Sequence, residues 1–162
     1  MKPSPLQLER SSIGNVTVRV ADRGVVSPEV EVEVIPTFAR HNDNPLRWLV
    51  AIKISFGRSD DRPIPYEGQI ECDGVFTIVD ESLAEERQLR LIAVTAPSML
   101  YAAAREVIAS LTARGKNGLF LLPSVSFTDQ TLIPPKAEDA SSQSETQTPV
   151  EPSLSSAQAA SE

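Results

Sequence analysis

The chain has 162 residues, a formal net charge of −7, one cysteine and one histidine. Its length fits one domain with extensions instead of two domains. The acidic balance argues against a nucleic-acid backbone or an anionic membrane surface as the main partner. A single cysteine excludes an internal disulfide and suits a reducing compartment. The N-terminus has no apolar signal core and no run of about 18 apolar residues follows, so we expect a cytoplasmic protein without membrane insertion.

Four segments alternate between apolar and polar residues, which is typical of half-buried β-strands. Each segment has its apolar side at even residue numbers, and the segments are Val16–Val20, Val30–Val34, Leu46–Phe56 and Tyr66–Val79. We expect Pro36 to end the second strand, because proline cannot donate to a sheet ladder. The polar stretch from Thr37 to Pro45 is then predicted to be a loop.

Helical patterns follow the four strands. Asp80 is predicted to cap a helix over Glu81–Ala96, since carboxylates favour the positive end of a helix. After Pro97 one helical stripe continues at Leu100, Ala104, Val107, Ile108 and Leu111. We expect Arg114 and Gly115 to end it, with the glycine in the left-handed conformation. The sequence leaves open whether Pro97 kinks one helix or separates two.

Four strands followed by a helix predict an α+β domain, with a four-stranded antiparallel sheet and one long helix that is straight or kinked at Pro97. We assign residues 1–133 to this domain. Residues 134–162 are rich in serine, glutamate and proline and have no hydrophobic period. This composition predicts a disordered acidic tail, whose role the sequence leaves open.

The sequence contains no arrangement of residues that would support catalysis. His41 is the only histidine and lies in a polar loop, while Cys72 occupies an inward position of a predicted strand. One cysteine and one histidine do not form a structural zinc site. Neither a glycine-rich phosphate loop nor a nucleophile elbow is present. We therefore expect no enzyme, no cofactor and no metal.

The segment from Pro97 to Phe127 resembles the SecB family of tetrameric export chaperones. The matching residues, in order and spacing, are Leu100, Ala104-Arg105-Glu106, Ile108, Ser110-Leu111, Ala113-Arg114-Gly115, Leu122-Pro123 and Val125-Ser126-Phe127. Pro28-Glu29-Val30 and Gly74-Val75-Phe76-Thr77-Ile78 fall at corresponding places upstream. The resemblance implies a SecB-like fold, a homotetramer built as a dimer of dimers, and an ATP-independent holdase for unfolded polypeptides that works in protein export.

One long helix cannot cover four strands completely, so part of the valine face should stay accessible to a client. In SecB proteins the corresponding second-strand residues, here Val30, Val32 and Val34, contribute to an apolar client groove. Phe38 and Trp48, beside the predicted loop, are further candidates from sequence alone. The alternative is that this face packs only on the helix and on a partner subunit. For that oligomer interface we expect the helix stripe of Leu100, Ala104, Val107, Ile108 and Leu111.

Carboxylates occupy odd-numbered positions in the second and fourth predicted strands, on the face opposite the apolar side chains: Glu29, Glu31, Glu33, Glu67, Glu71 and Asp73. A solvated sheet face explains them without any partner. In SecB proteins, however, an acidic sheet surface docks the basic SecA motor. This chain departs from that pattern at Asn15, Arg19 and Gln69, which leaves SecA coupling open. The alternatives are a SecB-like chaperone specialised for one antitoxin-type client, without translocase coupling, and a non-chaperone interaction module.

Overall fold

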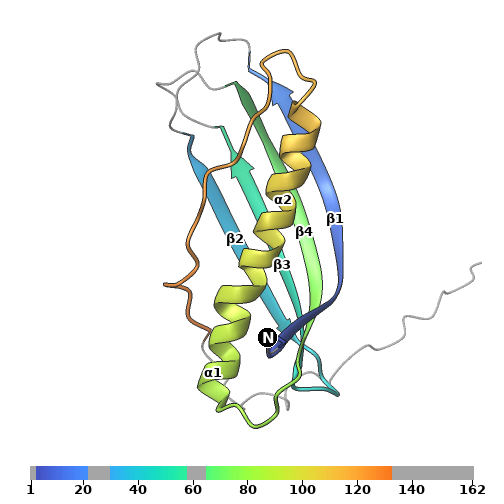
Figure 1. Cartoon of the computed structure of the whole chain (residues 1–162), viewed down its shortest axis with the longest axis vertical. Coiled ribbons are helices and arrows are strands. Elements are labelled where there is room, and N and C mark those ends of the chain that lie inside the picture. Colours follow the sequence, from blue (N-terminus) through green and yellow to red (C-terminus); the bar gives the residue numbers. More distant parts are fainter. Residues whose placement is uncertain (1–2, 22–29, 58–64, 133–162) are drawn as a thin grey trace, which may run out of the picture.

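The computed structural model describes residues 3–21, 30–57 and 65–132. Four strands form one antiparallel sheet with the order β1-β4-β3-β2. They are β1 (Leu6–Val20), β2 (Val32–Arg40), β3 (Arg47–Phe56) and β4 (Tyr66–Ile78). A single helical rod crosses one face of the sheet (Figure 1). The predicted α+β class and antiparallel sheet are confirmed, and the predicted tail over 134–162 lies outside the described residues.

The helical rod consists of α1 (Glu85–Arg90), a π-helical turn (Leu91–Thr95) and α2 (Ala96–Thr112), which follow one another without a break. In the π-helical turn the Ala96 N–H donates to the Leu91 carbonyl, five residues earlier. Pro97 explains this turn. It has no N–H for the carbonyl of Ala93, and its ring would clash with that carbonyl in a regular α-helix. The two predicted stretches are therefore one helix with a widened turn.

The helix begins four residues later than expected, and Asp80 does not cap it. The Asp80 carboxylate accepts hydrogen bonds from the backbone N–H of Ser82 at 3.1 Å and from its hydroxyl at 2.6 Å. These bonds hold a turn ahead of the helix, which is the other common use of an aspartate side chain. Ala84 occupies the cap position and makes no side-chain cap.

Two strands are longer than the sequence indicated. β1 begins at Leu6 instead of Val16, and register shifts between Leu8 and Arg10 and between Ile13 and Val16 break its alternation. Such bulges insert an extra residue, so a strict period of two disappears from the sequence. β2 continues to Arg40, so the loop predicted from Thr37 onward starts too early.

Pro36 lies in the middle of β2 and does not end it. β2 is an edge strand. The Glu31 carbonyl accepts from the Gly57 N–H, and the His41 N–H donates to the Arg47 carbonyl. Because backbone groups alternate in direction along an antiparallel strand, the odd-numbered residues of β2 bond to β3 and the even-numbered residues face the free edge. Pro36 therefore costs the sheet no ladder hydrogen bond.

The apolar face of the sheet has two covers. α2 packs on β4, β3 and β1 and has little contact with β2. Residues 119–132, here called the C-terminal segment, run beside α2 on the same face (Figure 1). Phe120, Leu122 and Phe127 of this segment are buried, while the intervening Leu119 and Leu121 are exposed. This segment thus covers the sheet in an extended conformation and is not a strand.

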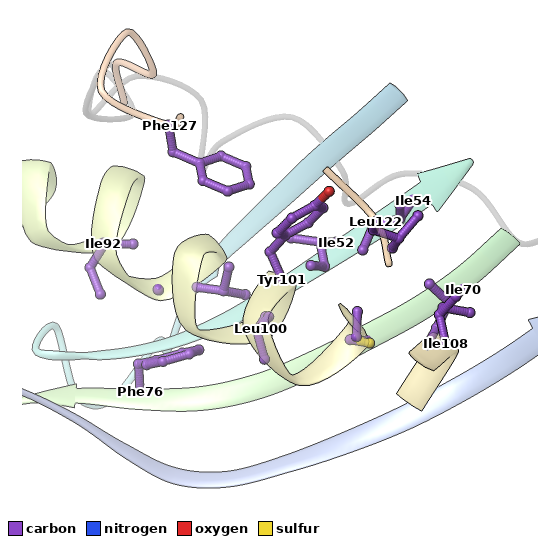
Figure 2. Packing of buried hydrophobic residues seen from close by; sticks show 14 of the residues in the cluster. Ile52, Ile54, Ile70, Phe76, Ile92, Leu100, Tyr101, Ile108, Leu122 and Phe127 are labelled. Atoms are coloured by element: carbon purple, nitrogen blue, oxygen red, sulfur yellow. The ribbon is translucent and has the colours of Figure 1, made fainter. Parts of the chain in front are cut away.

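The rod from Glu85 to Thr112 is, within the described part of the chain, the one helix long and apolar enough to cross a membrane by length and composition. A helix that forms the core of a soluble domain passes the same test. Here Leu100 and Ile108 are buried against the sheet (Figure 2), and Ala104 is fully buried as well. Its apolar character is therefore used within the domain.

The glycines after α2 have different tasks from those predicted. Gly118, with φ of 77°, occupies the left-handed region, whereas Gly115 does not. The N–H of Gly115 donates to the Thr112 carbonyl at 2.8 Å. A Cβ on Gly115 would collide with the hydroxyl of Tyr66. Gly115 is therefore needed for the close approach of this turn to β4.

We predict that Gly115→Ala lowers the free energy of unfolding by about 1–3 kcal/mol, because the added methyl group strains this contact. Tyr66→Phe should restore part of the loss, since it removes the hydroxyl that the methyl group meets. Urea denaturation of both single variants and the double variant measures the coupling. Strictly additive losses would contradict the assigned contact.

Candidate functional site

An apolar strip runs along the helix side of β2. Val32, Val34, Pro36 and Phe38 alternate with exposed residues of the outer face and are all half-buried. Val30, just before the strand, is half-buried too. We call these five residues the β2 strip. They include four of the five predicted client-groove residues, and the structure places them in one row.

The strip is half-buried because the covers of the sheet end beside it. Phe120 packs on Phe56 and Tyr66, with ring centroids 5.6 and 5.9 Å apart. Leu122 points toward Ile52 and Ile54 of β3 (Figure 2). β3 is consequently sealed, while β2 lies at the margin of the cover. An apolar row that is neither sealed nor fully exposed suits a surface that still gains from contact with another chain.

Hydrogen bonds from two side chains of α2 hold the Leu122-Pro123 part of the C-terminal segment in place. The Tyr101 hydroxyl donates to the Pro123 carbonyl at 2.7 Å, and Arg105 Nε donates to the Leu122 carbonyl at 2.9 Å. Tyr101 also packs edge-on against Phe127, with ring centroids 6.1 Å apart. The margin of the cover is therefore anchored to α2 and not to β2.

Trp48, the fifth predicted groove residue, belongs to the core, with 5% of its surface exposed. It pairs with Arg40 across β2 and β3. The Arg40 guanidinium lies 5.5 Å from the ring centroid. Arg40 Nε also donates to the Pro45 carbonyl at 2.7 Å, and its Nη1 lies 3.8 Å from a Glu85 carboxylate oxygen. Trp48 is thus a buried residue beside the Arg40 end of β2 and is not part of the accessible surface of the β2 strip.

The outer face of the sheet gathers the predicted carboxylates, but cations lie between them. Glu31, Glu33 and Glu67 are exposed, and Glu29 lies outside the described residues. A carboxylate oxygen of Glu71 lies 3.4 Å from Nζ of Lys53 in β3. The other carboxylate oxygen accepts a hydrogen bond from Nδ2 of Asn15 at 3.3 Å. This exposed ion pair weakens the negative character of the face without adding much stability.

The pattern of compensated carboxylates continues along the same face. The Ser12 hydroxyl donates to Asp73 at 2.6 Å. Glu9 accepts from Thr77 and from Arg47, and these hydrogen bonds hold the pKa of its carboxyl below the usual value. Glu9 was missed from the sequence because β1 was predicted to begin later. The face is therefore of mixed charge, and not a uniform acidic surface.

A cavity of about 810 Å³ opens on this face near one end of the sheet. Among its lining residues, Arg19 shares the cavity with Glu31, Glu33 and Glu67. Arg19 is also the cross-strand partner of Glu67. One of the departures from the SecB pattern thus places a cation beside Glu67 of the predicted acidic docking surface.

The helix stripe predicted for the oligomer interface is mostly used by the chain itself. Leu100, Ala104 and Ile108 are buried, and Val107 is half-buried. Leu111 is 55% exposed, and Leu119 and Leu121 of the C-terminal segment are 61% and 57% exposed. The exposure of Leu119 and Leu121 could have been predicted from the sequence, because they alternate with Phe120 and Leu122. Of the predicted stripe, only Val107 and Leu111 remain accessible to a second subunit.

The described residues hold no group of histidine, cysteine, aspartate or glutamate side chains that could bind a metal. Cys72 is 3% exposed. Burial, with a smaller contribution from the charge of Asp73, raises the pKa of its thiol to about 11. A neutral, buried thiol is a poor nucleophile, so Cys72 acts as a small core residue.

Comparison with known proteins gives a family and solved structures of similar fold. Residues 12–130 match the SecB family, described as preprotein translocase subunit SecB. A solved Mycobacterium tuberculosis protein, the SecB-like chaperone Rv1957 in complex with a ChAD peptide from the HigA1 antitoxin, has a similar fold with a TM-score of 0.56. The two share 18% identity over 75% of this chain and 91% of that one. No curated protein matches the chain.

Proposed function

The chain belongs to the SecB family and is a chaperone and not an enzyme; from this premise we propose that it is an ATP-independent holdase for unfolded or non-native polypeptides. The observation that carries the proposal is the β2 strip, a row of apolar side chains that the chain covers only in part. Three of these side chains, Val30, Val32 and Val34, are those that the family resemblance assigns to the client groove. The family assignment also argues against a pure interaction module.

The proposed mechanism is burial of apolar client segments on the β2 strip. Each fully buried client Leu, Val or Phe side chain would contribute roughly 1.5–3 kcal/mol, and partial burial contributes less. Several such contacts hold a client, and the loss of a few releases it, so no nucleotide is needed for the cycle. Since burial is non-directional, one strip accepts many sequences.

The charge of the outer face determines whether this chaperone can dock the SecA motor and so act in protein export. SecA docking in the family uses an acidic sheet surface, whereas Lys53, Arg47 and Arg19 lie among the carboxylates here. This favours the second candidate function, a chaperone specialised for one client and working without the SecA motor. The antitoxin peptide bound to the similar mycobacterial chaperone makes an antitoxin a reasonable client to test. We place either activity in the cytoplasm.

Client protection by adjacent β2 residues tests the proposal. We predict that Val34→Asp reduces suppression of aggregation of an unfolded client by at least about fivefold, because a charge in the strip resists burial. The matched control is Ile35→Asp, one residue away on the outer face, which should protect clients like the wild type. Light scattering with several unrelated clients, without nucleotide, measures both variants and separates a general holdase from a specialist.

Equal protection by both Asp variants, with folding verified by circular dichroism, would exclude the β2 strip as the client site. If Ile35→Asp alone lost activity, the outer face would be the binding surface instead.

For assembly we propose a homotetramer that uses the exposed leucines near the end of α2. Leu111→Asp is predicted to lower the mass of the particle in light scattering, because an exposed apolar contact between subunits would gain an unpaired charge. Ile35→Asp again serves as the control. An unchanged mass would mean that Leu111 contacts no other subunit.

A further inference from the structure

We propose that β2 holds an extended client through the side chains of its strip alone, and that Pro36 prevents a client strand from adding to its free edge. This inference rests on the proposed chaperone function and specifies how that site reads its ligand. It makes Pro36 a residue that sets the class of client.

The free edge of β2 carries the backbone groups of the even-numbered residues. The bonds of Glu31 and His41 to β3 fix this direction at both ends of the strand, and the register is continuous between them. No described strand pairs with this edge. Outward N–H donors therefore belong to Val32, Val34, Phe38 and Arg40, and the central position, Pro36, has none.

A strand added to this edge would need a donor at every second residue, a spacing of about 6.6–6.8 Å. Pro36 divides the four donors into two pairs and places its ring where the partner strand would approach. The carbonyl of the added strand at that point would be left without a partner. Prolines are a known means of keeping an edge strand from pairing with other chains.

The opposite edge of the sheet lacks this feature. β1 spans 15 residues and contains no proline. The interruption is thus specific to the edge beside the β2 strip, where apolar extended chains are expected to gather. An uninterrupted edge there would invite clients to join the sheet and persist as a β-aggregate.

The ligand class follows from this geometry. A client that makes no backbone bonds to β2 is recognised by its apolar side chains, independent of its register and of its peptide N–H groups. Segments that contain proline, or peptides with N-methylated amides, should bind as well as ordinary segments with the same side chains.

The test uses the full chain and an extended peptide of about ten residues with lysines at both ends, in which leucine or valine alternates with serine so that the apolar side chains face the strip in one register only. Two further versions carry N-methyl groups on alternate amides, one version for each alternate set. We expect all three dissociation constants to agree within about twofold. Strand addition predicts instead that one methylated set, and not the other, loses about tenfold or more, because only one set would donate to the edge.

Pro36→Val gives the reciprocal measurement, because it restores an N–H at the centre of the edge. The unmethylated peptide should gain about threefold or more in affinity, or the variant should associate with itself along the edge. In the wild type, hydrogen exchange at the amides of Val32, Val34, Phe38 and Arg40 should not slow when the peptide binds.

Protection of these four amides in the wild type, or a loss confined to one methylated set, would overturn the inference while leaving the chaperone function in place. Failure of all three peptides to bind, together with no protection of any unfolded client, would remove the proposed function and this inference with it.

Discussion

The fold depends on a mismatch between the width of one helix and the width of four strands. A helix with its side chains is about 10–12 Å across, and four strands spaced about 4.8 Å apart extend further than that. α2 covers β4, β3 and β1 and leaves β2 largely uncovered. The C-terminal segment narrows this gap through Phe120 and Leu122. The apolar surface that stays partly uncovered is the β2 strip, and the proposed function depends on it.

Much of the sheet was predictable because its parity is regular. The even-numbered apolar positions of β3 and β4 are all buried, as the alternation indicated. The errors came where position in the sheet overrides local preference. Pro36 would end a central strand, but on the free edge it costs nothing, and the sequence alone does not reveal which strand is the edge. The bulges of β1 likewise hide a strand whose alternation is interrupted.

The residues of the candidate site were predicted only in part, because alternation gives the face of a strand but not its place in the sheet. Alternation placed Val32 and Val34 on the apolar face of their strand, the resemblance to SecB assigned them to the groove, and the structure places them in the strip. Trp48 has the same parity but lies one strand further in, where it is buried and Arg40 lies over its ring. The charge of the outer face could not be predicted from β2 and β4 alone. It depends on Lys53 and Arg47 of β3, which only the register brings beside Glu71 and Glu9.

The central claim is that clients contact the helix side of β2 and not the outer face of the sheet. Methyl-group NMR of the full chain during titration with an unfolded apolar client tests it most directly, since neighbouring residues report on opposite faces. The account predicts that the methyl signals of Val32 and Val34 shift on binding while those of Ile35 and Leu49 stay in place. Shifts at Ile35 and Leu49, with Val32 and Val34 unchanged, would contradict it.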